Sequence, residues 1–575
     1  MNFSDLIGRT TCLRVGDYVR IGIVTILTLG LALRLSALFF GLPQQLDPDE
    51  RLSIMAAGRM LGGDRLLDPQ WYGWPGYTLH TLLAFSFAAF AALQLALGQF
   101  ETLRDLEALF YNAPDALFVI GRLWGAISGT LCILATYMLA KRVLPRAWAL
   151  AAATLVALSP TMLEFSMLTR PDMLQILFML LVMIFAIDAA EDPSARQRNF
   201  LLAGICLGLA TASKYPGVVA VLAILIAASL EQGVSLRTRA IGLGIAAGAS
   251  VAAVLISAPY LILNLSGVLQ HLANEAREFH VSATSPGFVG ALWQYLTNAL
   301  PRGMSAPITW LGYAGLLALF FGPSRHAIVI PSVFLGYLLF MSALNLYWER
   351  WVLPLIPLIA IGFVYIIFNL SHRISARMPG RPVSASAVLI IVLAVLPLLT
   401  GSVSIAVAKA QNRDTRVVAY DWIMDNLPRG SSVLLESYTP QLSVDDFRVL
   451  VAHAGSILSW ADTEKSKRPP GFFGSIGGGL STGDTESESA VEKLRVAGVQ
   501  YVVVNGWYQR YRNEAALIED SDRAAVRAAR QEAQRVVEIY ESIFAATVEV
   551  QRFEGGKTFS GGNISVLRVT NSGTM

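Results

Sequence analysis

Residues 19–42 read VRIGIVTILTLGLALRLSALFFGL, and this apolar stretch decides the fold class of the chain. It is long enough to cross a bilayer, whose hydrocarbon layer takes about 20 apolar residues per helix. It contains Arg34 and no small-residue cleavage site followed by a soluble domain, so we expect a retained spanning helix, not a cleaved signal peptide. Further apolar runs follow at 76–98, 117–140, 147–163, 173–190, 200–230, 240–263, 307–322, 327–345, 351–370 and 384–408.

The overall composition agrees with a membrane protein. The 575 residues are 54% hydrophobic and only 15% charged, whereas soluble globular chains carry about 25% charged residues. This composition excludes a disordered chain, collagen, a coiled coil and a disulfide-rich secreted scaffold. The net charge of +3 is too small to indicate a nucleic-acid partner. The cysteines match no zinc or redox spacing, and the histidines show no metal-ligand pattern: Cys12, Cys132 and Cys206 are the three cysteines.

Basic residues in the short loops predict the orientation, because cytoplasmic loops carry an excess of lysine and arginine. Six basic clusters separate the apolar runs, and we expect all six, together with the N-terminus, on the cytoplasmic side. The clusters are Arg9, Arg14 and Arg20; Lys141, Arg142 and Arg146; Arg196 and Arg198; Arg237 and Arg239; Arg325; and Arg373, Arg377 and Arg381.

Two of the runs do not fit a single crossing in this orientation. Residues 76–98 would have to begin and end outside, so we interpret them as a re-entrant or interface-lying helix pair. Residues 200–230 hold the sequence KYPG at 214–217 and are interpreted as two spans that meet at the outer face. The prediction is therefore about eleven spans, with the N-terminus inside and the C-terminus outside.

The composition changes after residue 408, where the chain becomes charged and polar. Short apolar stretches at 432–436 and 500–504 indicate strands. Helix-like segments follow Asp414 and Ser521, and both residue types suit a helix N-cap. Strands and helices together predict a soluble domain of the α/β class.

These patterns predict a polytopic α-helical membrane protein with a C-terminal α/β soluble domain. The transmembrane domain covers residues 1–408 and includes an external loop at 43–116. The soluble domain covers residues 409–575 and lies outside. Within it, residues 470–486 are rich in glycine and serine and are interpreted as a loop.

Polar residues gather at the predicted outer ends of the spans, and charges at a membrane edge are functional hypotheses by default. Each group has an ordinary structural explanation: a solvated loop or helix N-cap, a topological anchor, a snorkelling lysine, or an aromatic belt with one ion pair. Their shared location on one membrane face, on separate loops, favours a reaction at the outer interface. The groups are DPDER at 47–51, TRPD at 169–172, KY at 214–215 and YWERW at 347–351, with Arg122 as a weaker candidate.

The residue types in these groups suit the transfer of a group from an anionic donor. Three carboxylates within residues 47–50 repel one another, so at least one is expected to have a raised pKa near a low-dielectric surface. Such a carboxylate can take a proton from an acceptor hydroxyl. Lys214 and Arg350 suit contacts to a phosphate. The cations would hold a membrane-anchored donor while the carboxylates activate an acceptor.

In their order along the chain, these stretches resemble the GT-C glycosyltransferases that use polyprenyl-phosphate sugars. The similar groups are the protein O-mannosyltransferases and the bacterial lipid A aminoarabinose transferases, and the resemblance covers most of residues 15–440. In these enzymes the first external loop carries membrane-parallel helices, which accounts for the interpretation of residues 76–98. The resemblance rests on DPDER at 47–51, WYGWPGY at 71–77, GRL at 121–123, RPD at 170–172, GLA at 208–210 ahead of KY at 214–215, and ER at 349–350 ahead of LP at 353–354.

The resemblance implies a role for individual residues. Asp49 would be the catalytic base, Glu50 would support it, and Asp172 would help to bind or orient the acceptor. The donor phosphate would be bound by Lys214 and Arg350, with Tyr347 and Arg122 as weaker candidates.

The predicted function is an inverting glycosyltransferase that moves a hexosyl or pentosyl group from a polyprenyl-phosphate donor to an acceptor hydroxyl on a protein, lipid or glycan. No redox cofactor is required, and a divalent metal is compatible with the reaction although no ligand set demands one. The alternatives are a transporter or lipid flippase, which needs polar residues along helix interiors, and a non-catalytic receptor, which leaves the membrane-edge carboxylates unexplained. Only 7 of the 44 basic residues are lysine, which suits a GC-rich bacterial genome. We therefore expect a bacterial inner membrane, with the outer face periplasmic.

Overall fold

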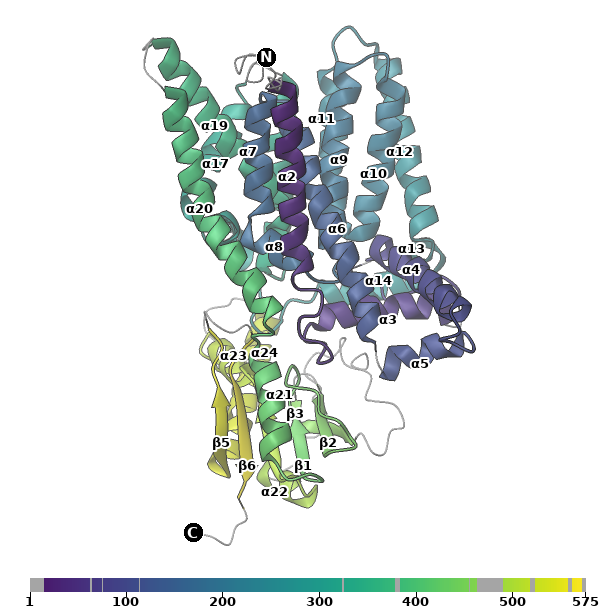
Figure 1. The fold of residues 1–575 in the computed structure, drawn as a ribbon, viewed down its shortest axis with the longest axis vertical. Helices are drawn as coiled ribbons and strands as arrows, with labels where there is room; N and C mark the ends of the chain where they lie inside the picture. Colours follow the sequence, from purple (N-terminus) through teal and green to yellow (C-terminus); the bar gives the residue numbers. More distant parts are fainter. Residues whose placement is uncertain are drawn as a thin grey trace, which may run out of the picture.

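The computed structural model describes most of the chain and joins a helical bundle to an α/β domain at one end (Figure 1). Several residues discussed above lie outside the described ranges: Arg9, Cys12, Arg14, Pro75, Arg381, 470–486 and Ser521. The described residues are 15–62, 65–74, 76–112, 114–322, 325–377, 383–453, 456–462, 490–517, 523–556 and 561–570.

The larger part of the molecule is a bundle of roughly parallel helices (Figure 1). α9 (Asp172–Glu191) lies at its centre, packed against α6, α10 and α11 and buried along most of its length, as expected for a helix that is apolar all round. The other bundle elements are α2 (Val15–Leu35), α6 (Asp115–Ala140), α7 (Arg146–Ala157), α8 (Pro160–Ser166), α10 (Arg196–Ser213), η1 (Tyr215–Ala220), α11 (Val221–Leu230), α12 (Leu236–Ser257), α15 (Gly287–Gln294), η2 (Tyr295–Ala299), α16 (Leu300–Met304), α17 (Ala306–Leu319), η3 (Arg325–Ile328), α18 (Val329–Ser342), η4 (Glu349–Leu355), α19 (Ile356–Arg377) and α20 (Val383–Ala410).

The helices agree with a multi-pass membrane protein. Among the described residues, 8 helices are long and apolar enough to cross a membrane, or up to 9 if the pair α7 and α8, bent by 62°, is one span. Two shorter apolar helices, Tyr215–Leu230 and Ala306–Leu319, come close to that length. The sequence predicted about eleven spans because it counted these shorter helices and also α10 as crossings.

The predicted interruption of residues 200–230 is confirmed. α10 ends at Ser213, Lys214 has an extended backbone, and η1 begins at Tyr215. Pro216 follows at once, and a proline has no N–H to continue the hydrogen bonds of the preceding helix. The chain therefore turns at Lys214 and places this lysine between two bundle helices.

A second group of helices lies across the end of the bundle that is nearer the α/β domain (Figure 1). α4 is one of the helices long enough to cross a membrane, yet it packs on α3 and α6 at this end. Its membrane-parallel placement stays a prediction. The helices of this group are α3 (Pro48–Gly62), α4 (Tyr77–Ala96), α5 (Arg104–Asn112), α13 (Tyr260–Leu263) and α14 (Leu265–Glu275).

The C-terminal domain is of the predicted α/β class. The two strands expected at 432–436 and 500–504 are β1 and β4, and Asp414 caps α21 by accepting the N–H of Arg416. The elements of the domain are α21 (Thr415–Asn426), β1 (Ser432–Leu435), β2 (Arg448–His453), β3 (Ser456–Asp462), α22 (Ala490–Val496), β4 (Tyr501–Val504), α23 (Trp507–Ala515), α24 (Ala524–Ala545), β5 (Thr547–Phe553) and β6 (Ile564–Val569).

One six-stranded sheet with the order β3-β2-β1-β4-β6-β5 forms the middle layer of this domain. β1 pairs in parallel with both β2 and β4, while the outer pairings are antiparallel. Because successive side chains of a strand point to opposite faces, Val433 packs with α21 on one face and Leu434 packs with α24 on the other. Helices on both faces are the usual cover for parallel strands.

Contacts between the two parts fix the sheet beneath the end of the bundle. The partners in the bundle are loop residues, and the loop residue Val281 joins the hydrophobic core of the C-terminal domain. The polar contacts are Gly41 N to Asn412 Oδ1 (2.8 Å), Arg416 Nη1 to the Leu46 carbonyl (2.6 Å), Gln441 N to Gln44 Oε1 (2.8 Å), Ser282 N to Glu514 Oε1 (2.9 Å) and Arg523 Nη2 to the Ser285 carbonyl (2.9 Å).

Candidate active site

The acidic stretch at the start of α3 is ordered by its first residue. Asp47 Oδ1 accepts the backbone N–H groups of Asp49 (2.9 Å) and Glu50 (3.1 Å) and so caps the helix. Pro48 occupies the first helical position, where the missing N–H has no intrahelical partner to lose. This cap fixes where the next two carboxylates point, and they point into different surroundings.

Arg170, in the link between α8 and α9, joins two of these carboxylates. Its Nη2 lies 2.7 Å from Asp47 Oδ2 and its Nη1 lies 2.9 Å from Asp49 Oδ2. Burial disfavours the charged form of Asp47, but the charge and hydrogen bonds of Arg170 outweigh burial, so the pKa of Asp47 lies below its usual value. Asp47 is therefore not a carboxylate of raised pKa, because a cation neutralises it.

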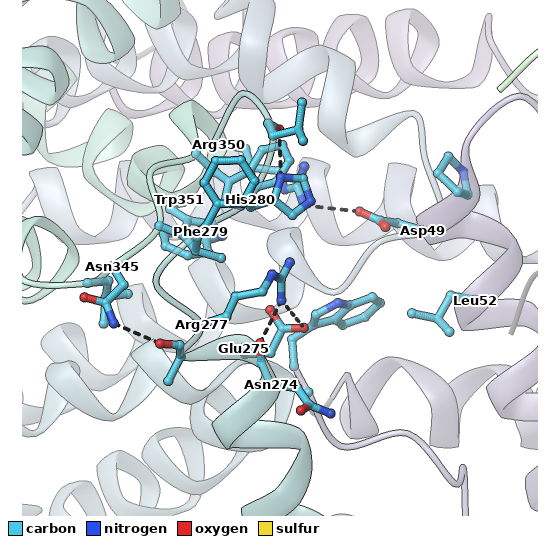
Figure 2. A pocket seen from close by; sticks show the side chains of 18 of the residues that line it. Asp49, Leu52, Asn274, Glu275, Arg277, Phe279, His280, Asn345, Arg350 and Trp351 are labelled. Carbon is cyan, nitrogen blue, oxygen red and sulfur yellow. Dashed lines mark hydrogen bonds and ion pairs between the residues drawn. The ribbon is translucent and has the colours of Figure 1, made fainter. Parts of the chain in front are cut away.

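Arg350 approaches Asp49 from η4 (Figure 2). Its Nη2 lies 3.4 Å from Asp49 Oδ2, and its guanidinium carbon lies 4.6 Å from the centre of the Trp348 ring. Its Nε is buried and has no hydrogen-bond partner among the described residues. Arg350 thus holds Asp49 more loosely than Arg170 does, and its buried Nε is left without a partner among the described residues.

Lys214 and Asp172 form a fourth ion pair at the same site. Lys214 Nζ lies 2.7 Å from Asp172 Oδ1. Asp172 is the first residue of α9, where the helix N-terminus stabilises a negative charge. Both side chains are largely buried, and both line the cavity described below.

Glu50 faces away from this group and is fully buried with Arg122. Arg122 Nε and Nη2 donate to Glu50 Oε1 (2.9 Å) and Oε2 (2.7 Å), and Arg122 Nη1 donates to the carbonyls of Leu38 and Phe40. Glu50 Oε1 also accepts the N–H of Thr169. A bidentate pair that is saturated in this way connects α3, α6 and two loops, and it has no donor directed at a substrate.

The structure therefore brings together Asp49, Asp172, Lys214 and Arg350, and it leaves three of the other sequence-based candidates apart. Glu50 and Arg122 do not line the cavity, which differs from the roles expected of them as support for the base and as a phosphate contact. Tyr347 does not line it either. Its ring packs on Tyr295, with the ring centres 4.6 Å apart, and its N–H bonds the Ala283 carbonyl.

A cavity of about 1660 Å³ lies between the end of the bundle and the C-terminal domain. Figure 2 shows Asp49 and Arg350 on its wall, with Glu275, Arg277 and His280 on an adjoining segment. Trp71 also lines the cavity, and its Nε1 is buried without a hydrogen-bond partner among the described residues. A large cavity whose wall carries paired charges among apolar side chains can bind a charged ligand.

Sequence reasoning missed the wall formed by the end of α14 and the segment after it. Burial and the charge of Asp49 raise the pKa of Glu275, although Arg277 and more distant cations oppose this. Burial and the charge of Arg277 lower the pKa of His280 to about 4, so its imidazole is neutral at physiological pH. The signal in the sequence was the charge-rich stretch NEAREFH at 274–280, which follows an apolar run.

The C-terminal domain supplies the opposite wall, which was also not predicted. Tyr438, Asn505, Trp507 and Arg510 follow the strands β1 and β4 and line the cavity, together with Arg416 at the start of α21. No motif in the sequence marks these positions, because they come together only through the strand order of the sheet.

A metal site is not evident from the side chains. The described residues contain no group of three or more His, Cys, Asp or Glu side chains that could hold a metal ion. The carboxylates near the cavity are instead paired with arginine and lysine.

Fold and site together define a multi-pass helical membrane protein with a paired-charge cavity between its bundle and a C-terminal α/β domain. Residues 108–262 match the family described as dolichyl-phosphate-mannose-protein mannosyltransferase. This confirms the expected resemblance to the protein O-mannosyltransferases over that part of the chain, which includes Arg170, Asp172 and Lys214. No curated protein matches the chain.

Solved structures similar to the chain are glycosyltransferases of low sequence identity. The oligosaccharyltransferase AglB from Archaeoglobus fulgidus, in complex with an inhibitory peptide and a dolichol-phosphate, is 14% identical, with a TM-score of 0.47 over 86% of this chain and 71% of that one. ArnT from Cupriavidus metallidurans, bound to undecaprenyl phosphate, is 15% identical, with a TM-score of 0.48 over 77% of this chain and 87% of that one. The S. cerevisiae protein O-mannosyltransferase complex bound to the sugar donor is 17% identical, with a TM-score of 0.33 over 46% and 36%.

Proposed function

We propose that the protein is a glycosyltransferase that moves a sugar from a polyprenyl-phosphate donor to an acceptor hydroxyl, with inversion at the anomeric carbon. The observation that carries the proposal is the position of Asp49 on the cavity wall, with Arg350 beside it and the pair Lys214–Asp172 lining the same cavity. The match of residues 108–262 to the mannosyltransferase family supports the reaction class. The site is at an end of the bundle, which suits a donor whose polyprenyl chain stays in the bilayer.

Asp49 acts as the base in this proposal. Both of its ion pairs are made through Oδ2, so Oδ1 takes the proton of the acceptor hydroxyl. Arg170 holds the carboxylate by a direct contact and by its second contact to Asp47, which caps the same helix. A base fixed in this way stays within hydrogen-bonding distance of the hydroxyl, and general-base catalysis depends first on that distance.

The cations stabilise the leaving group. As the acceptor oxygen forms its bond to the anomeric carbon, the bond from that carbon to the phosphate oxygen breaks, and polyprenyl phosphate leaves with one more negative charge. Lys214 and the partly exposed guanidinium of Arg350, which both line the cavity, are the cations for this charge. Asp172 positions Lys214 through the 2.7 Å contact, which assigns it to the donor side of the reaction. Preorganised charges of this kind often supply the largest part of catalysis.

The proposed location rests on the basic loops of the sequence. The expected cytoplasmic clusters put the cavity and the C-terminal domain on the outer side, which is the periplasm of a bacterial inner membrane. The donor is then a membrane-anchored polyprenyl-phosphate sugar, and the acceptor is a protein, lipid or glycan. A transporter or flippase is not favoured, because transporters bind their substrates near the bilayer midplane.

The direct test uses purified full-length protein in detergent and a panel of labelled polyprenyl-phosphate sugars. We expect release of polyprenyl phosphate from one donor when membrane extract supplies the acceptor, and a product with the opposite anomeric configuration. Retention of configuration would contradict the inverting mechanism. No release with any donor, by protein that binds polyprenyl phosphate, would contradict the transferase itself.

A further inference from the structure

The carboxyl edge of the C-terminal sheet faces the cavity. β1 has β2 on one side and β4 on the other, both parallel to it, so the strand order reverses between β1 and β4. Open α/β sheets bind ligands outside the carboxyl ends of their strands at such a reversal. Here Tyr438 after β1 and Trp507 after β4 line the cavity, on the wall opposite the bundle.

The two loops at this edge are locked together. Asn505 accepts the N–H of Trp507 at 2.9 Å and donates its side-chain amide to the carbonyl of Ser437. The buried carboxylate of Glu436 accepts the N–H of Asn505 at 2.6 Å. Tyr438 is held at φ 66°, a left-handed conformation that is unfavourable for a bulky residue. Strain of this kind persists where the surroundings enforce it, and it concentrates at ligand sites.

The locked loops present an aromatic platform with a cation beside it. The ring centres of Tyr438 and Trp507 are 5.8 Å apart and the planes are inclined by 33°. The guanidinium carbon of Arg510 lies 5.0 Å from the centre of the Trp507 ring. Arg510 is exposed to the cavity and forms no ion pair with the described acidic residues, unlike Arg170 and Arg350.

This combination selects a particular ligand chemistry. The C–H face of a sugar ring is apolar and packs on aromatic rings, while an unpaired guanidinium binds phosphate or carboxylate. We infer that Tyr438, Trp507 and Arg510 form the acceptor subsite and that it takes a sugar ring carrying an anionic group. The assignment of this subsite to the acceptor rests on the proposed function. The existence of a binding site is argued from the geometry alone. Asp49 lines the same cavity, so a sugar bound at this subsite can present a hydroxyl to the base.

The test measures binding, not turnover, so that its failure is separate from failure of the transferase. Full-length protein in detergent is titrated with glucose 6-phosphate, glucose and inorganic phosphate, followed by saturation-transfer NMR. We expect glucose 6-phosphate to bind best, with its Kd raised about tenfold by Trp507→Ala and about fivefold by Arg510→Gln, as expected for loss of a stacking or charged contact. Tyr438→Phe, which keeps the ring, is expected to bind as the wild type does.

Two control variants make the result decisive. Arg512→Ala removes an exposed arginine of the same helix that does not line the cavity and should leave all three titrations unchanged. Lys214→Met reports whether the probe binds at the donor phosphate site instead, because that lysine belongs to the donor side. Loss of binding in Lys214→Met with retention in Trp507→Ala would overturn the inference, as would equal Kd values for glucose and glucose 6-phosphate.

Discussion

Asp49 and Glu50 are neighbours in the chain, yet the structure gives them opposite surroundings. Asp49 keeps 27% of its side chain exposed on a cavity wall and shares one oxygen between two arginines. Glu50 is 0% exposed, and both of its oxygens are bound by Arg122. Both lie in the first turn of α3. Because consecutive residues of a helix point in different directions, one carboxylate faces the cavity and the other faces Arg122.

The difference shows how to tell a charged side chain that acts on a ligand, here called a working group, from one that only holds the structure together. A structural pair saturates its donors and acceptors, because unmet buried charges are costly. A working group keeps an unfilled oxygen or N–H toward a space that a ligand can enter. By that criterion Asp49 is a working group, while Glu50 and Arg122 hold α3 against α6.

The largest effect expected is on turnover in Asp49→Asn. Loss of the base should lower the transfer rate by about 10³-fold, the size typical of general-base catalysis. Donor binding, measured with polyprenyl phosphate, should change little, because the amide keeps the shape of the side chain. Asp49→Glu is the matched control and should retain part of the rate. Near-wild-type turnover in Asp49→Asn would show that Asp49 is not the base and does not differ from Glu50 in function.

Breaking the structural pair should affect stability instead. Arg122→Met leaves Glu50 buried without its cation, which typically costs about 3–5 kcal/mol of unfolding free energy. Thermal unfolding of the detergent-solubilised protein measures the loss. Adding Glu50→Gln to Arg122→Met should restore part of the stability, since the uncompensated charge is then gone. If the Arg122→Met protein were stable but bound the donor more weakly, Arg122 would be a phosphate-binding residue, as the sequence suggested.

Replacement of Lys214 should have a smaller effect on turnover than replacement of Asp49. Lys214→Met removes a cation from the leaving group and is expected to lower kcat by about 10²-fold, as removal of one electrostatic donor does in other enzymes. Lys214→Arg keeps the charge and should recover part of the rate. Asp172→Asn should raise the KM for the donor more than the KM for the acceptor. The opposite order of KM effects would place Asp172 with the acceptor, as the sequence suggested.

The smallest effect concerns a third carboxylate, Glu436, which is buried and forms no ion pair with the described basic residues. Burial raises its pKa to about 8, opposed in part by the N–H of Asn505 and the charge of Arg510. The folded protein therefore binds a proton between the usual glutamate pKa and about 8 that the unfolded chain does not bind. Stability should fall as pH rises through that window and level off above it. Glu436→Gln should flatten this part of the stability profile; an unchanged slope would contradict the assignment.

The sequence was sufficient for the features that depend on local chemistry. Apolar runs, the sequence KYPG at 214–217 and the charged groups at 47–51, 169–172 and 347–351 predict the helices, the break and four residues that meet at the cavity. It could not separate Asp49 from Glu50, because that requires the position of Arg122, which approaches from a helix more than sixty residues away. Trp507 and Tyr438 were missed for the same reason, since only the order of strands brings them together.

The cap formed by Asp47 has a consequence for how this architecture can diversify. Asp47 binds both the start of α3 and Arg170, so the segment before it, 36–45, ends at an anchored point. Among the described residues, the cavity wall includes none of this segment, while Gly41 and Gln44 bind the C-terminal domain. Exchanges in 36–45 are therefore expected to change how that domain is seated on the bundle, while the cap of Asp47 keeps the start of α3 in place.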